Sequence, residues 1–231
     1  MFEDLQKQSL ASNLELFERG LVPSTFGNVS VFDRNRNAVA IKPSGISYQK
    51  MSVDDIVVVD LSGEVLIGKR RPSSDMLTHV QFYRDFPELG SIVHTHSEYA
   101  TIWAQAGMSI PPLGTTHADY FNDAIPVTRN LTDAEIKADY LRNTAKVIVE
   151  TINHDDIYGV PAVLVYAHGP FCWGKNGQEA VNNADMLELT AKMAFKTLQL
   201  NRDVEPIGQT LHNLHFQRKH GRDATYGQPK K

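Results

Sequence analysis

Apolar positions recur along the chain at two periods, which predict helices and strands in alternation. Apolar residues between 3 and 19 fall on one broad helical face, and Gly20 follows as a C-cap. Residues 29–32 and 38–41 flank a polar turn and read as a β-hairpin. Further strands are expected at residues 56–60, 65–67, 90–97, 125–127, 160–167 and 171–173, and further helices at 72–86, 98–105, 131–152, 176–200 and 207–220.

This alternation indicates an α/β protein, and the early hairpins require antiparallel neighbours. We therefore expect a three-layer α/β/α fold with a central mixed, mostly antiparallel sheet. With 231 residues and no long linker, the chain is expected to form a single domain over residues 1–231. No Gly-x-Gly-x-x-Gly or Gly-x-x-x-x-Gly-Lys segment occurs, so the sequence does not support a nucleotide-phosphate loop.

Composition narrows the possible partners. The formal net charge is −4, which argues against binding to nucleic acid. No apolar stretch approaches the roughly 18 residues of a membrane helix. The first five residues are acidic and amphipathic, unlike a signal peptide. The single cysteine, Cys172, cannot form an internal disulfide, so a cytoplasmic location is expected.

Nine histidines stand out, and three of them indicate a metal site. His94 and His96 flank Thr95 in a predicted strand, where side chains two apart share a face. Such a pair alone is more often structural, but His168 ends another apolar strand before Gly169. Three histidines at strand ends are typical of an open catalytic metal site. Asp75, at a predicted helix start, is a fourth candidate ligand or an acid/base group, or only a first-turn acid.

Three short segments combine glycine with small polar residues, at 26–30, 42–45 and 72–75. Glycine lets the main chain approach a ligand closely, and serine hydroxyls and helix N-terminal amides bind phosphate. Lys42 could add a positive charge. Each segment alone is equally compatible with an ordinary turn or cap, so their meaning comes from combination with the histidines.

Together these motifs resemble the class II aldolase family, and within it the sugar-phosphate 4-epimerases, over essentially the whole chain. The shared segments are Gly-Asn-Val-Ser at 27–30, Lys-Pro-Ser-Gly at 42–45, Pro-Ser-Ser-Asp at 72–75, Ile-Val-His-Thr-His-Ser at 92–97, Ala-Thr-Ile-Trp-Ala-Gln-Ala-Gly at 100–107, Gly-Thr-Thr-His-Ala-Asp-Tyr-Phe at 114–121, His-Gly-Pro-Phe at 168–171 and Tyr-Gly-Gln at 226–228. The resemblance implies a fourfold homotetramer with sites at subunit interfaces, to which the neighbour contributes a C-terminal residue.

The resemblance also assigns roles to individual residues. It implies that zinc, or manganese or cobalt in its place, is held by His94, His96 and His168, with Asp75 as a metal-site acid. Asp119 and Tyr226 match the two acid/base residues. The expected substrate-binding residues, chiefly at the phosphate, are Gly27, Asn28, Lys42, Ser44, Gly45, Ser73 and Ser74.

The implied reaction interconverts L-ribulose 5-phosphate and D-xylulose 5-phosphate, which differ at C4. The ketone is at C2, so the hydrogen on C4 is not acidic and simple proton abstraction fails. Breaking and re-forming the C3–C4 bond avoids this difficulty: a metal acts as Lewis acid, and two groups exchange protons on opposite faces.

Two positions depart from the family pattern. Leu141 stands where a Tyr-Glu-x-x-Thr-Gly segment usually carries its acidic residue, and Thr225 replaces a common tyrosine. Several alternatives remain open: a class II sugar-phosphate aldolase, an epimerase of a related ketose phosphate, a non-catalytic metal-bound scaffold, or a metallohydrolase. Where this chain has Asp75, the aldolases have a glutamate, which favours the epimerase.

Overall fold

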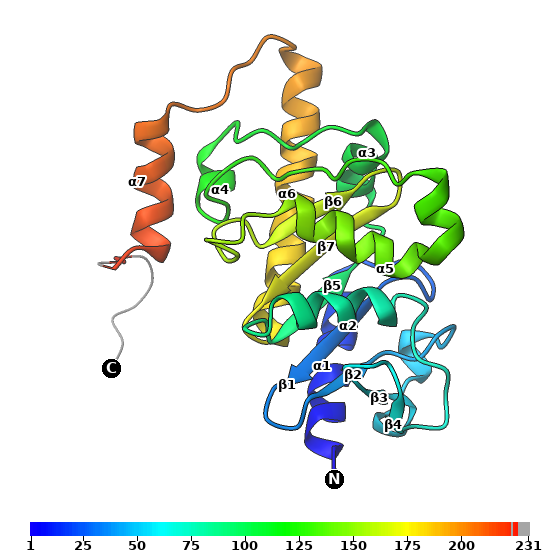
Figure 1. The fold of residues 1–231 in the computed structure, drawn as a ribbon. Helices are drawn as coiled ribbons and strands as arrows, with labels where there is room; N and C mark the ends of the chain where they lie inside the picture. The colour runs from blue at the N-terminus through cyan, green and yellow to red at the C-terminus, as the bar shows by residue number, and fades with distance from the viewer. Residues whose placement is uncertain (223, 226–231) are drawn as a thin grey trace.

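The computed structural model describes residues 1–222 and 224–225, and its strands form a seven-stranded sheet (Figure 1). The strand order is β4-β3-β2-β1-β5-β7-β6, and all neighbouring strands pair antiparallel. The strands are β1 (Asn28–Asp33), β2 (Ala38–Ile41), β3 (Val57–Asp60), β4 (Val65–Ile67), β5 (Ser91–His94), β6 (Ala162–Val165) and β7 (Gly169–Gly174). This confirms the predicted antiparallel character of the sheet.

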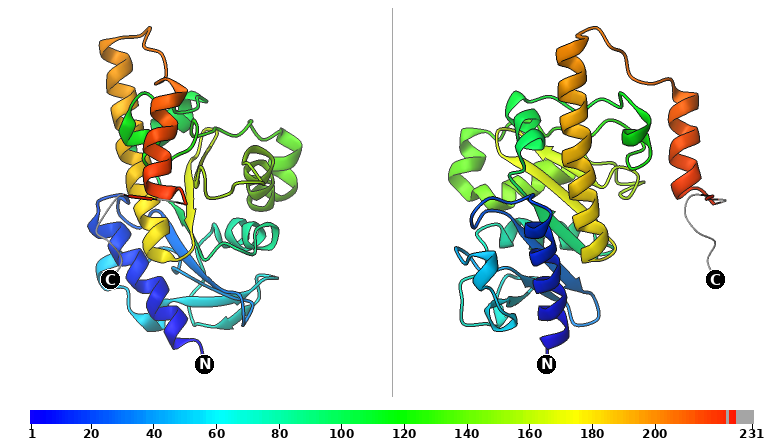
Figure 2. Two further views of the ribbon diagram at one scale, coloured as in Figure 1. Left: turned by 90° about the vertical axis from the view of Figure 1, so that its left-hand side faces the viewer. Right: turned by 180° about the vertical axis from the view of Figure 1, so that it is seen from behind.

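Helices cover both faces of the sheet, which confirms the expected three-layer architecture. Figure 2 shows the sheet between two helical layers, with α1 and α6 on one face and α2 and α5 on the other. The α-helices are α1 (Glu3–Glu18), α2 (Met76–Asp85), α3 (Glu98–Ala106), α4 (Thr115–Ala118), α5 (Asp133–Thr151), α6 (Gly177–Leu200) and α7 (Gln209–His220). Two 3-10 turns, η1 (Tyr48–Lys50) and η2 (Val53–Asp55), precede β3.

Strand alternation divides the buried apolar residues between two cores. In β1, Val31 belongs to the core under α1, α3 and α6, whereas Phe32 belongs to the core under α2 and α5. In β7, Cys172 faces the first core, and Phe171 and Trp173 face the second. Because both faces are buried, polar side chains can reach solvent or a ligand only near strand ends and in loops.

Local signals in the sequence identify most element boundaries. Thr132 and Glu135 form a capping box at the start of α5, and Gly20 takes a positive φ of 72° just after α1. The loop over 107–130 differs from the prediction in two respects. It contains the short α4, which was not expected, and its expected strand at 125–127 makes only isolated bridges. None of the helices in the described residues is both long and apolar enough to cross a membrane.

Asn13 joins α1 to the sheet at the residue where β1 extends past β2. The last β1–β2 pair is Ser30 with Ile41, so β2 has no residue paired with Val29. The buried Asn13 amide compensates: its Nδ2 donates to the Val29 carbonyl at 2.9 Å, and its Oδ1 accepts from the Val29 amide at 2.8 Å. This pair of bonds also anchors the chain beside Asn28.

We expect Asn13→Ala to lower the free energy of unfolding by about 1–3 kcal/mol, because it leaves the buried Val29 N–H unpaired and leaves the Val29 carbonyl only a long bond of 3.5 Å from the Ser9 hydroxyl. Urea denaturation followed by circular dichroism measures the loss. Lys7→Ala, at an exposed position of the same helix, is the control and should change stability by less than about 0.5 kcal/mol. Equal stability of the two variants would contradict this role of Asn13.

Candidate metal and phosphate site

One pocket collects nearly all the predicted site residues from segments far apart in the sequence. Its cavity volume is about 540 Å³, and it lies where β5 ends and α2 begins. The lining residues are Thr25, Phe26, Gly27, Asn28, Lys42, Pro43, Ser44, Gly45, Ser73, Ser74, Asp75, His94, His96, Tyr140, Leu141 and His168. Eleven of the expected ligands and binding residues therefore share one cavity, whereas Asp119 is not among the lining residues.

The three histidines converge tightly. One ring nitrogen from each of His94, His96 and His168 lies within 4.8 Å of the others. The secondary structure around them differs from the prediction. β5 ends at His94, so His96 lies beyond the strand, and His168 lies in the turn between β6 and β7. The close approach of His94 and His96 therefore arises from the chain after the strand end, and not from alternation within a strand.

A tight turn brings His168 to the other two ligands. Ala167 adopts a positive φ of 56°, and Gly169 passes close to the main chain of the His94–His96 segment. A Cβ atom at Gly169 would lie 2.7 Å from the Thr95 carbonyl oxygen, so a larger residue would push the two segments apart. Glycine at this position thus permits the approach of His168.

Hydrogen bonding sets the tautomer of His94. Its Nδ1 lies 3.0 Å from the Pro170 carbonyl, which can only accept, so this nitrogen carries the proton. Nε2 is then left with a lone pair, and it lies 3.2 Å from Nε2 of His96. The ring is also stacked on Phe171, with centroids 4.3 Å apart. His94 is therefore fixed with its unprotonated Nε2 directed toward the other histidines.

Burial favours the neutral form of all three imidazoles. It lowers the pKa of His94 to about 3, and it lowers the pKa of His96 and of His168 below the ordinary value of 6.5. Divalent metals bind neutral imidazole, so the convergent, unprotonated nitrogens fit such an ion. Tyr140 adds a polar neighbour, since its hydroxyl lies 3.3 Å from Nδ1 of His168.

Asp75 lies at the N-cap position of α2, but its carboxylate makes no hydrogen bond to the amides of that helix. Instead, Oδ2 accepts from Asn28 Nδ2 at 2.7 Å and from the Ser73 hydroxyl at 3.4 Å. Burial raises the pKa of Asp75, whereas the hydrogen bond from Asn28 favours its ionised form, and overall the pKa lies below its usual value. An ionised carboxylate thus lies beside the histidines, and its ligation of a metal stays a prediction.

The three glycine–serine segments come together around the same cavity. Gly27 has a φ of 73°, and a Cβ atom there would lie 2.5 Å from Val22 Cγ1 and 2.9 Å from the His94 carbonyl oxygen. The amides of Ser44 and Ser73 donate to the carbonyls of Arg71 and Lys42. An anion here would therefore be bound by side-chain hydroxyls and by other amides of these segments.

Lys42 supplies a buried positive charge to the pocket, since only 2% of its surface is exposed. Nζ donates to the Thr25 carbonyl at 3.1 Å and lies 4.8 Å from the centre of the Tyr48 ring. Burial lowers the pKa of Lys42 to about 8, with the negative charge of Asp75 acting against the shift. The ammonium is thus still largely protonated at neutral pH and can attract an anionic ligand.

Asp119, the expected acid/base residue, lies apart from this pocket at the end of α4. It accepts from His215 Nδ1 at 3.0 Å and from Arg218 at 3.1 Å, both on α7 (Figure 1). Burial raises the pKa of Asp119, but the bonds from Arg218 and His215 outweigh it and lower the pKa overall. Tyr226 lies outside the described residues. The triad and the expected acid/base pair are thus not brought together within the described part of one chain.

Sequence reasoning did not assign Phe26 and Tyr140 to the site. The Phe26 ring centre lies 5.6 Å from that of His96, and the Tyr140 ring centre lies 6.2 Å from that of His168. Phe26 is the first residue of the glycine segment at 26–30, which was the available signal. Tyr140 begins the segment that corresponds to the Tyr-Glu-x-x-Thr-Gly pattern of the family, which was the signal there, whereas its helical periodicity carried none.

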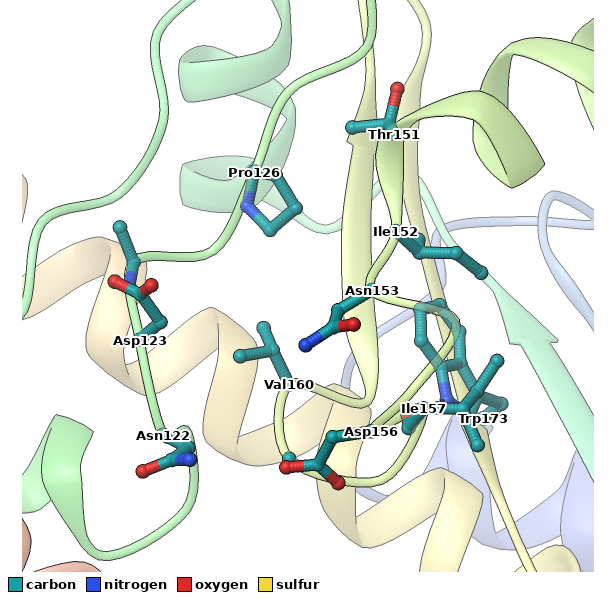
Figure 3. A pocket seen from close by; sticks show the side chains of 12 residues that line it. Asn122, Asp123, Pro126, Thr151, Ile152, Asn153, Asp156, Ile157, Val160 and Trp173 are labelled. Carbon is teal, nitrogen blue, oxygen red and sulfur yellow. Dashed lines mark hydrogen bonds between the residues drawn. The ribbon is translucent and has the colours of Figure 1, made fainter.

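A second hollow, about 260 Å³ in volume, lies among the loops beside Trp173 (Figure 3). Asp123, Asn153 and Asp156 border it together with Ile157 and Val160 (Figure 3). Its lining contains neither histidine nor cysteine. The pocket with the histidine triad is therefore the better candidate for metal and phosphate chemistry.

Comparison with known proteins agrees with this geometry. Residues 7–195 match the Class II Aldolase and Adducin N-terminal domain. The structure is similar to an L-fuculose 1-phosphate aldolase at 27% identity, covering 92% of this chain and 94% of that one, with a TM-score of 0.77. YgbL from Klebsiella pneumoniae is also 27% identical, with 93% and 99% covered and a TM-score of 0.70. The chain therefore belongs to the class II aldolase and adducin family.

Proposed function

We propose that the protein is a zinc-dependent L-ribulose-5-phosphate 4-epimerase, with manganese or cobalt able to replace zinc. The observation that carries the proposal is the shared pocket. It combines three neutral histidines, an ionised Asp75 and the glycine–serine segments around Lys42. A phosphorylated ketose offers the matching groups, because it has an anionic end and adjacent carbonyl and hydroxyl oxygens.

The chain's own residues can hold the two ends of such a substrate. Hydroxyls of Ser44, Ser73 and Ser74 and the Lys42 ammonium would bind the phosphate. His94, His96 and His168 would hold the metal, with Asp75 beside them. A divalent ion there would supply Lewis-acid stabilisation of the negative charge on the ketone fragment.

The reaction itself needs proton transfer at the C4 oxygen on both faces of the aldehyde. A base removes the C4 hydroxyl proton as the C3–C4 bond breaks, giving glycolaldehyde phosphate and the enediolate of dihydroxyacetone. After the aldehyde turns, the bond re-forms, and an acid on the other face returns the proton. Asp119 and Tyr226 are the proposed pair.

A homotetramer would reconcile this assignment with the separation of Asp119 from the triad. We infer that α4, α7 and the following C-terminal residues reach the metal pocket of a neighbouring copy. Leu211 and Leu214 on α7 are 42% and 63% exposed. Their exposure supports the inference that a neighbouring copy covers this face of the helix. A cytoplasmic pentulose 5-phosphate enzyme built this way needs two subunits for each site.

A class II aldolase is the second candidate, because an L-fuculose 1-phosphate aldolase is among the similar structures. The two reactions share carbon–carbon cleavage and differ in whether the aldehyde leaves. Asp75 favours the epimerase, since the family resemblance of the sequence implies glutamate at this position in the aldolases.

A coupled assay separates the candidates. Zinc-loaded protein given L-ribulose 5-phosphate should form D-xylulose 5-phosphate without free glycolaldehyde phosphate. Accumulation of the free aldehyde would identify an aldolase. Neither product, from protein shown to hold zinc, would contradict the proposed substrate.

Metal affinity should decrease as the pH is lowered, because protons then compete with the metal for the three histidines. The lowered pKa values of these histidines should shift the decrease to lower pH. Because burial lowers the pKa of all three imidazoles below 6.5, affinity should fall less between pH 8 and pH 6.5 than it would for a site of ordinary histidines. Below this range, protons compete for the ring nitrogens and affinity should fall. Competition against a fluorescent chelator measures this, and a loss between pH 7.5 and 6.5 as large as three ordinary imidazoles would give, about sixfold, would contradict it.

Tyr140→Phe should weaken metal binding by about tenfold, because it removes the hydroxyl beside Nδ1 of His168. Tyr166→Phe, at another partly exposed tyrosine, is the matched control and should leave affinity unchanged. The same chelator competition reads both. His96→Asn should abolish tight binding altogether.

Mixing inactive variants tests the shared site. His96→Asn and Tyr226→Phe subunits are each expected to have little activity alone, but Tyr226→Phe should retain metal. After co-refolding in equal amounts, about a quarter of the sites combine an intact triad with an intact neighbouring Tyr226, and activity should recover to that level. No recovery in mixed tetramers would mean that each subunit supplies its own pair.

A further inference from the structure

The helix α5 is interrupted where it passes the pocket. Asp139 has an extended conformation, with φ −164° and ψ 90°, and its Oδ1 accepts from the Arg142 amide as an N-cap does. Asn143 Nδ2 donates across the break to the Glu135 carbonyl at 2.8 Å. The interruption is thus stabilised by polar contacts, and it comes directly before Tyr140 and Leu141, which line the pocket.

Leu141 is held in place through its main chain. The Thr78 hydroxyl on α2 donates to the Leu141 carbonyl at 2.9 Å. The hydrogen bonds on either side of Leu141 are made by the side chains of Asp139 and Asn143. None of these contacts therefore depends on the leucine side chain. The identity of residue 141 can therefore change the pocket's chemistry without removing the contacts that position it.

Three residues that line the pocket form what we call the apolar wall, namely Phe26, Tyr140 and Leu141. Phe26 and Tyr140 are 58% and 40% exposed, and their rings flank His96 and His168. The Tyr140 hydroxyl is already near His168 Nδ1. Leu141 offers no donor or acceptor at the position where the family pattern carries an acidic side chain.

We propose that the apolar wall, through Leu141, selects a 1-deoxy ketose phosphate. In such a substrate C1, which is bonded to the C2 ketone at the end away from the phosphate, is a methyl group instead of a hydroxymethyl group. This inference rests on the proposed function. With the phosphate among the serine hydroxyls and the C2 and C3 oxygens toward the histidines, C1 is the end left to meet this wall. Phe26 and Leu141 offer no partner to a hydroxyl there, and the Tyr140 hydroxyl already lies beside His168 Nδ1, whereas a methyl group gains apolar contact.

The step is chemically the same for both substrates. The C3–C4 bond of the 1-deoxy ketose breaks to give glycolaldehyde phosphate and the enediolate of hydroxyacetone, and it re-forms with the opposite configuration at C4. No oxidant, reductant or co-substrate is consumed. The 1-deoxy analogue of D-xylulose 5-phosphate is therefore a direct probe beside D-xylulose 5-phosphate itself.

The zinc-loaded wild-type protein should epimerise the 1-deoxy compound with a kcat/KM about 10- to 100-fold above that of the hydroxymethyl compound, the range available to apolar discrimination. Leu141→Gln should reduce this ratio at least tenfold. Leu141→Met preserves an apolar side chain and should keep the ratio. Leu66→Gln makes the same chemical change on β4, outside the pocket, and should also keep it.

Calorimetric binding of the two compounds to the same four proteins separates this inference from the proposed reaction. A wild-type affinity preference for the 1-deoxy compound that Leu141→Gln removes supports the apolar wall, even if neither compound epimerises. Equal or weaker binding and turnover of the 1-deoxy compound by wild type would overturn the inference, as would a preference unaffected by Leu141→Gln. Epimerisation of D-xylulose 5-phosphate would then still uphold the proposed function.

Discussion

Burial of the central sheet on both faces is the constraint on which the rest of the structure depends. Alternate residues of β1, β5 and β7 enter two separate apolar cores, so these strands have no solvent-exposed face for polar chemistry. The histidine, serine and glycine residues therefore gather where β5 ends and the neighbouring loops begin. His94 is the last residue of that strand, and it is held there by the Pro170 carbonyl and by the Phe171 ring.

The pocket at this end contains charges that would be costly in isolation. Lys42 is buried and Asp75 is half-buried, and because they carry opposite signs they offset each other. Neutral histidines add no charge of their own. A divalent cation and a phosphate dianion entering together would also balance, which makes the pocket electrostatically suited to the pair.

Asp119 shows a different arrangement, in which the expected catalytic carboxylate is fixed by α7 and not by the metal pocket. His215 and Arg218 both bind it, so the position of Asp119 depends on α7 staying docked against α4. If a neighbouring copy completes the site, assembly and catalysis are coupled through this one helix. The proposed chemistry then belongs to the oligomer.

Local patterns in the sequence determined most of the secondary structure. The capping box of Thr132 and Glu135, the turn after α1 and the alternation in the strands depend on neighbours a few residues apart, so they can be read from spacing. The family motifs likewise identified the eleven pocket residues.

Only the tertiary structure decided how those residues meet. His96 reaches His94 through chain beyond the strand, and His168 arrives from a turn more than seventy residues away. The α5 pattern read as one helix, yet polar contacts of Asp139 and Asn143 support an interruption that places Tyr140 and Leu141 over the pocket. Such placements depend on packing between segments that are distant in the sequence. The spacing of neighbouring residues carries no information about that packing.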